Sequence, residues 1–124
     1  MSRKTQQFTP LELEIMKVLW AAGPGNVQDV QAGLGGEPLA YTTVQTMLNI
    51  LVRKGKVKRI LKGRAYVYQP AVRRLDAVAQ TVSDLIDRMF GGSAEELVMG
   101  LLETNQLTPE RLKELQKKVE ESQQ

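Results

Sequence analysis

Apolar residues along the first seventy positions recur first at helical and then at strand spacing. Three stretches repeat apolar positions every three or four residues, which is typical of helices with one buried face. Two later runs, rich in β-branched and aromatic residues, flank Lys62-Gly63-Arg64, where a glycine is available for a turn. The pattern predicts helices between Pro10 and Gly23, Asn26 and Gly33, and Tyr41 and Gly55, then a hairpin of residues 57–61 and 65–69. Thr9 with Glu12, and Asn26 with Asp29, have the three-residue spacing of capping boxes at the first two helix starts.

The third predicted helix has an uncharged polar face. Its apolar side is formed by Val44, Met47, Leu48 and Leu51, at positions i, i+3, i+4 and i+7. No Asp or Glu occurs between Pro38 and Leu75, whereas residues 53–64 are rich in Lys and Arg. A polar helix face beside a cluster of cations suits the reading of base edges next to phosphates. We therefore expect Thr42, Gln45, Thr46 and Asn49 to read bases, and Arg53, Lys54, Lys58, Arg59, Lys62 and Arg64 to contact phosphates.

Two short helices separated by a Gly-rich turn and followed by a hairpin favour a winged helix-turn-helix domain over residues 8–70. The hairpin would be the wing, lying on the sugar-phosphate backbone. It could instead be a solvated edge hairpin whose lysines only prevent strand pairing between molecules. Residues 1–7 have no periodic pattern, and we expect a flexible arm there.

The chain after Ala71 changes character. Three further amphipathic helices are predicted, and their apolar stripes are too extensive for a segment of about 50 residues to bury alone. We expect residues 71–124 to form a three-helix dimerisation region, although folding back onto the basic domain is the alternative. The residues expected in the dimer contact are Leu75, Val78, Val82, Leu85, Ile86, Met89, Leu97, Leu101, Leu112 and Leu115. The fold class is thus mainly α with a small β-hairpin wing.

Charge and composition exclude several classes of function. The net charge of +3 divides unevenly, because residues 1–74 carry +8 and residues 75–124 carry −5. The chain contains no His and no Cys, which excludes disulfides, His or Cys metal ligation and an imidazole triad. No apolar run is long enough to span a bilayer, and we expect a cytoplasmic protein without membrane insertion, cofactor or metal. An enzyme is the least favoured class, because the carboxylates lack His, Cys or a phosphate loop as partners.

Several segments taken together resemble the penicillinase and methicillin-resistance repressor family (the BlaI/MecI family). They cover nearly the whole chain, from about Phe8 to Val119, and no one of them is specific alone. They are Thr9-Pro10-Leu11-Glu12 with Ile15-Met16 and Leu19-Trp20, then the run from Leu39 to Leu48, then Lys54-Gly55 and Tyr66-Val67-Tyr68.

The resemblance implies a winged-helix repressor that binds palindromic operator DNA as a homodimer. It adds Thr43 to Thr42, Gln45 and Thr46 as a residue that would face the major groove and read bases. It also implies relief of repression by a membrane sensor-protease system, through cleavage in the dimerisation region at Gly100-Leu101. Three departures are visible. Gln45 and Ile50 stand where better-known members carry Arg, and Gly100-Leu101 stands where characterised repressors have Asn-Phe. The similar copper-responsive branch uses a C-terminal cysteine cluster, which this chain lacks.

We therefore expect a sequence-specific DNA-binding transcriptional repressor. The alternative from another class is a winged helix used for protein-protein assembly, with its basic face against an acidic partner. Sequence-specific binding in excess competitor DNA would separate the two.

Overall fold

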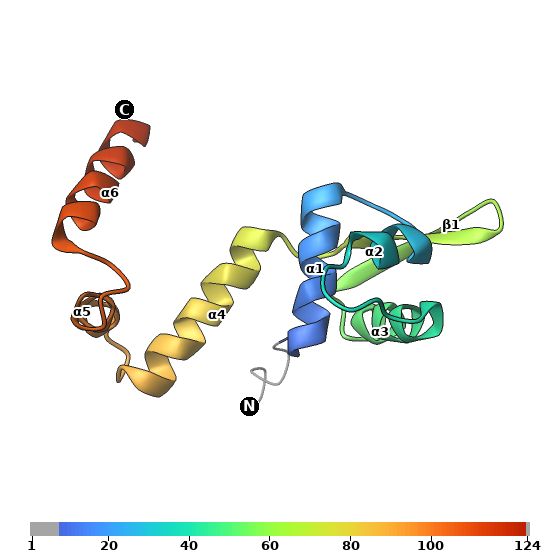
Figure 1. Ribbon diagram of the computed structural model, residues 1–124, viewed down its shortest axis with the longest axis horizontal. Coiled ribbons are helices and arrows are strands. Elements are labelled where there is room, and N and C mark those ends of the chain that lie inside the picture. Colours follow the sequence, from blue (N-terminus) through green and yellow to red (C-terminus); the bar gives the residue numbers. More distant parts are fainter. Residues whose placement is uncertain (1–7, 124) are drawn as a thin grey trace. The chain divides into compact units, whose positions relative to one another are not determined.

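The computed structural model describes residues 8–123, so the predicted flexible arm of residues 1–7 lies outside the described residues. The described part contains six helices and one hairpin (Figure 1). It divides into one compact unit up to Gln80 and another from Thr81. The elements are α1 (Pro10–Ala22), α2 (Val27–Gly33), α3 (Tyr41–Arg53), β1 (Val57–Lys62), β2 (Ala65–Pro70), α4 (Arg74–Met89), α5 (Ala94–Glu103) and α6 (Pro109–Ser122).

Reciprocal caps begin the first two helices, as the sequence predicts. The hydroxyl of Thr9 accepts the Glu12 backbone N–H at 3.2 Å, and the Glu12 carboxylate accepts the Thr9 N–H at 2.8 Å. Asn26 and Asp29 make the same exchange at the start of α2. Each pair satisfies backbone donors that a helix N-terminus leaves free, which fixes where α1 and α2 start.

The core of the first unit is enclosed by α1, α2, α3 and the base of the hairpin. Its members are apolar side chains that are at most 5% exposed. They are Ile15, Met16 and Leu19 of α1, Val27 and Val30 of α2, Val44, Leu48 and Leu51 of α3, and Val57 and Tyr68 of the strands. Because α3 contributes three fully buried side chains, its other face is fixed toward the outside.

The hairpin is antiparallel, with Val57 opposite Pro70 and Lys62 opposite Ala65. Each strand is one residue longer than predicted. Gly63 has φ +65° at the tip, a conformation that favours glycine, and the tip extends beyond the helices of the first unit (Figure 1). At the base, Tyr68 exchanges two backbone hydrogen bonds with Gly25 in the turn before α2, at 2.8 and 3.0 Å. Three helices with a hairpin attached in this way form a winged helix, as predicted.

The second unit consists of the later part of α4 with α5 and α6. Ser93 caps α5 by accepting the Glu96 N–H, and Thr108 caps α6 by accepting the Arg111 N–H. Neither α5 nor α6 contains a buried residue. None of the described helices is long and apolar enough to cross a membrane.

Candidate nucleic-acid interface

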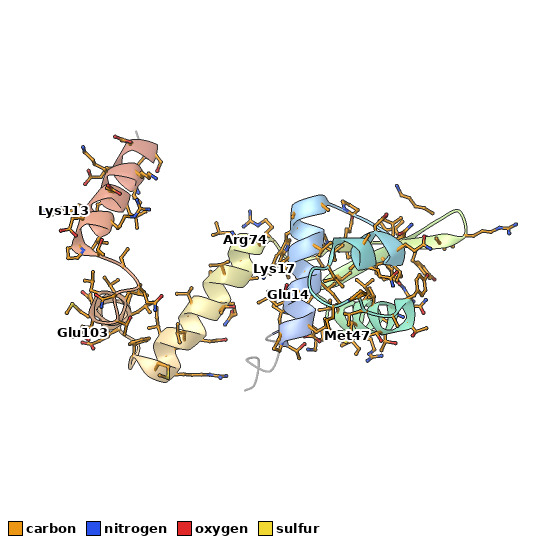
Figure 2. The ribbon with its side chains drawn as sticks, viewed as in Figure 1. Glu14, Lys17, Met47, Arg74, Glu103 and Lys113 are labelled. Atoms are coloured by element: carbon orange, nitrogen blue, oxygen red, sulfur yellow. The ribbon has the colours of Figure 1, made fainter. Side chains whose placement is uncertain are left out.

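The first half of α3 presents the residues that the sequence assigns to base reading. Thr42, Thr43, Gln45 and Thr46 are all exposed. The opposite side of α3 is anchored in the core, and the labelled Met47 in Figure 2 is a partly buried residue packed against it. The structure therefore places these four polar side chains together on an outer surface, in the arrangement expected for them.

A hollow of about 300 Å³ lies between α3, the start of α2 and the second strand of the hairpin. It brings Gln45 together with Arg64, which the sequence assigns to two different tasks. Tyr41 and Tyr66 also line the hollow, as does Gln28 of α2. The full lining is Asn26, Val27, Gln28, Tyr41, Gln45, Arg64, Ala65, Tyr66 and Tyr68.

Sequence reasoning missed Tyr41, Gln28 and Tyr66 as members of this surface. Tyr41 lies one helical turn before Gln45, and that spacing could have indicated it. Gln28 and Tyr66 carry no comparable signal, because only the folded chain brings α2 and the hairpin to the same side of α3. All three side chains can donate hydrogen bonds, which makes them suited to phosphate or base acceptors.

Most of the cations assigned to phosphate contact are exposed. Arg53 ends α3, while Lys58, Lys62 and Arg64 lie along the hairpin and at its tip. Arg59 is exposed as well, but its guanidinium carbon lies 4.3 Å from the centre of the Tyr66 ring. These five side chains place exposed positive charge on the hairpin and at the end of α3, as an interface with a polyanion requires.

Lys54 has a different environment from the other cations in this group. Its ammonium lies 2.8 Å from both carboxylate oxygens of Glu12, whose side chain is 2% exposed. Burial alone would raise the pKa of Glu12, but hydrogen bonds from Lys54 and the Thr9 backbone and the charge of Lys54 outweigh burial and lower it. Lys54 therefore neutralises a buried carboxylate and joins the end of α3 to the start of α1, and we remove it from the proposed phosphate contacts.

Asn49 also has partners within the protein. Its side-chain oxygen accepts a hydrogen bond from Arg59 at 3.0 Å and one from the Tyr68 hydroxyl at 3.4 Å. Both donors belong to the hairpin, whereas Asn49 belongs to α3. The polar face of α3 is thus divided into an outward part, formed by the exposed polar residues between Thr42 and Thr46, and a part that contacts the wing.

The apolar stripe of α4 is largely exposed. Leu75 and Met89 are each 70% exposed, and Val78, Val82 and Leu85 range from 37% to 42%. Among the other residues assigned to dimer contact, Leu115 is exposed and Ile86, Leu97, Leu101 and Leu112 are half-buried. A stripe of this kind on one chain is a candidate surface for a second copy.

The Gly100-Leu101 peptide bond lies inside α5. The carbonyl of Gly100 accepts the backbone N–H of Thr104 at 3.1 Å and its hydroxyl at 2.7 Å. A Cβ at Gly100 would lie 3.3 Å from the Phe90 ring, so a larger residue would require the ring to shift. Glycine at this position therefore fits the close approach of Phe90.

The sequence matches the family described as penicillinase repressor over residues 8–121. The penicillinase repressor of Bacillus licheniformis is 32% identical, over 96% of this chain and 94% of its own length. The methicillin resistance regulatory protein MecI of Staphylococcus aureus strain N315 is 24% identical, over 93% of this chain and 94% of its own length. A solution structure of the monomeric form of Bacillus licheniformis BlaI with the blaP half-operator is similar, with 35% identity and a TM-score of 0.49, covering 56% of this chain and 87% of that one. On the strength of the match over residues 8–121, this chain belongs to the penicillinase repressor family, whose members are transcriptional repressors and not enzymes.

Proposed function

We propose that the protein is a sequence-specific repressor that binds a palindromic operator as a homodimer. The observation that carries the proposal is the outer surface of the first unit, where exposed Gln45 lines one hollow with the exposed Arg64 of the hairpin, and Thr42 and Thr46 are exposed on the same helix. The core anchors α3 with this surface outward. The helix would enter a major groove and the hairpin would follow the adjoining backbone. A repressor must reach the DNA that it regulates, so the proposed location is the cytoplasm.

In this proposal, phosphate contacts supply most of the affinity and base contacts supply the sequence specificity. Thr42, Thr43, Gln45 and Thr46 read base edges, and Arg53, Lys58, Arg59, Lys62 and Arg64 neutralise phosphates. If about 6 to 8 phosphates are neutralised by a dimer, the logarithm of the binding constant falls with the logarithm of salt concentration at a slope of about −5 to −7. Gln45 is the residue most able to change the preferred sequence, because its amide can both donate and accept.

The exposed stripe of α4 supports the homodimer. Leu75, Val82, Leu85 and Met89 would leave water by packing against the same stripe of a second copy. Two recognition helices would then address half-sites about one or two helical turns apart, on the order of 10 bp per turn. A palindromic operator follows from the two-fold symmetry of such a dimer.

Relief of repression by cleavage between Gly100 and Leu101 completes the proposal. Because both residues lie within α5, a protease would have to unwind part of that helix to reach the bond. Glycine in a helix interior makes such unwinding less costly, by about 1 kcal/mol relative to alanine. Mass spectrometry of the protein from induced cells should detect a fragment that ends at Gly100, and an uncut chain under full induction would remove this step.

The function is tested by selecting bound fragments of genomic DNA with the purified full chain, in excess competitor DNA. We expect enrichment of an inverted repeat. On that duplex, Gln45→Ala should cost about 1 to 3 kcal/mol and relax preference at one base pair. Arg64→Ala should weaken all sequences alike, although both residues line the same hollow. Binding to all duplexes alike would favour the protein-protein alternative, and a change of preference in Arg64→Ala would contradict the division of roles.

A further inference from the structure

We infer that Asn49 does not read a base but is a positioning residue, which holds the Arg59 guanidinium of the wing where it meets the DNA backbone. The inference rests on the proposed DNA-binding function. It also reassigns a residue that, from its position on the polar face of α3, would be expected to contact a base.

The contacts of Asn49 join three parts of the first unit. Its oxygen accepts from Arg59 on β1 at 3.0 Å and from the hydroxyl of Tyr68 on β2 at 3.4 Å. Tyr68 is 2% exposed, and its backbone is bonded to Gly25 in the turn before α2. The amide oxygen is therefore held by a buried, fixed tyrosine and is itself a fixed acceptor for Arg59.

These contacts oppose base reading by Asn49. A side-chain amide recognises adenine by accepting a hydrogen bond through its oxygen while donating one through its nitrogen. The oxygen has two lone pairs, and Arg59 and Tyr68 already lie where they can donate to both. Adenine recognition would require at least one of these bonds to break, which would remove a side-chain link between α3 and the hairpin.

The same contacts orient Arg59. One guanidinium nitrogen donates to Asn49, and the Tyr66 ring lies 4.3 Å from the guanidinium carbon. An arginine has five N–H donors, so the remaining donors can reach a phosphate while the group stays in place. Holding a long side chain in its binding conformation lowers the entropy lost on association. Asn49 thus acts on affinity through Arg59.

A double-mutant cycle on the full-length protein tests this role. Asn49→Ala, Arg59→Ala and the double variant are titrated against the selected duplex and against its single-base-pair variants. Asn49→Ala should weaken binding about 3- to 10-fold on every duplex, and its effect should fall below about twofold when Arg59 is already alanine. The matched control is Lys58→Ala, the neighbouring exposed cation of β1, whose effect should multiply independently with that of Asn49→Ala.

Two results would overturn the inference. One is a change of preference at a single base pair in Asn49→Ala, which would make Asn49 a base-reading residue. The other is an Asn49→Ala effect that persists undiminished beside Arg59→Ala, because Asn49 would then act independently of Arg59. Thermal melting of each variant separates these outcomes from loss of fold.

A measurement without DNA separates failure of the inference from failure of the proposed function. In the free protein, NMR signals of the Arg59 side-chain N–H groups should be protected from exchange and should lose that protection in Asn49→Ala, but not in Lys58→Ala. Rapidly exchanging Arg59 signals in the unmodified chain would contradict the inference. A chain with protected Arg59 that binds no duplex specifically would instead contradict the proposed function alone.

Discussion

The unit up to Gln80 and the unit from Thr81 differ in how far they bury their apolar side chains. Among the described residues, every buried apolar side chain lies between Ile15 and Tyr68. The second unit has comparable apolar stripes, yet Val82, Leu85, Met89, Met99 and Leu115 remain at least 37% exposed. The first unit is closed by its own chain, whereas the second presents a surface that a second copy could close.

The two units also differ in charge. The first unit has exposed cations on the hairpin and at the end of α3, whereas the sequence from residue 75 onward carries a net charge of −5. A net negative charge disfavours contact with phosphates. Under the proposed function, base recognition resides in the first unit, and tight binding to an operator requires the second unit to join two copies.

The largest effect is expected from charges placed in the apolar stripe. Val82→Asp combined with Leu85→Asp should dissociate the proposed dimer, because neither carboxylate can be desolvated at the contact without a partner. With the two recognition helices no longer linked, affinity for the operator should fall about 100-fold or more. Sedimentation and operator titration measure the two results together.

Asp87→Ala provides the matched control for this pair. Asp87 is exposed on α4 but lies off the stripe, so its removal should leave both the assembly state and operator binding unchanged. If the double variant sediments as a dimer, the α4 stripe is not the dimer contact. If it is a monomer that retains full operator affinity, operator binding does not require the second unit.

The next largest effect concerns the ion pair between Glu12 and Lys54. Glu12→Gln should destabilise the first unit by about 2 kcal/mol, because Lys54 is 27% exposed and recovers only part of its hydration. The melting temperature should fall by about 10 °C. Glu14→Gln is the control, since the Glu14 pair with Lys17 is more than half exposed and both side chains lie on the outer side of α1 (Figure 2). Equal losses in the two variants would refute a special role for the buried pair.

Acid should remove the same stabilisation gradually. The pKa of Glu12 is lower in the folded protein than its ordinary value near 4.5, so the unfolded chain takes up the proton first. The stabilisation is therefore fully present above about pH 4.5 and is lost as the pH falls through the lower, folded pKa. Denaturant midpoints of the unmodified chain and Glu12→Gln should converge as the pH is lowered through this range. A constant difference down to pH 2 would contradict the linkage.

The smallest effect is a shift in the thermal unfolding midpoint of the second unit when the protein is diluted. Trp20 is the only tryptophan and lies in the first unit, where its indole N–H donates to the Val72 carbonyl at 3.0 Å. The midpoint of thermal unfolding followed by Trp20 fluorescence should not depend on protein concentration. Thermal unfolding followed by the circular dichroism of the helices should include a second transition, whose midpoint shifts by a few degrees on tenfold dilution. Parallel shifts of both signals would mean that the units unfold together.

Features defined by neighbouring residues could be predicted from the sequence. The reciprocal caps of Thr9 with Glu12 and Asn26 with Asp29 depend on residues three positions apart, and both are present. The bounds of α3 and the hairpin follow from local periodicity and from Gly55 and Gly63. Helical spacing predicts Thr42, Gln45 and Thr46 as a group because a helix face repeats at fixed intervals, whereas Thr43 is added only by the family resemblance.

Features that depend on distant residues could not be predicted in this way. Glu12 was recognised as a cap, but its second task, pairing with Lys54, joins positions 42 residues apart. Asn49 shares the polar face with Gln45, and nothing in helical spacing indicates that Arg59 would occupy its oxygen. The hollow that joins Gln45 to Arg64 likewise exists only after the hairpin has packed against α2 and α3.

The bond from Trp20 to Val72 has a consequence for how the chain is made. It spans 52 residues, and the Glu12 to Lys54 pair spans 42, so the first unit is tied by contacts between its beginning and its end. Such non-local contacts slow folding, and synthesis delivers the chain from the N-terminus. A nascent chain that still lacks Tyr68 and Val72 cannot complete the winged helix. The winged helix is therefore completed only after Val72 has emerged from the ribosome, before the acidic helices that follow it in the chain.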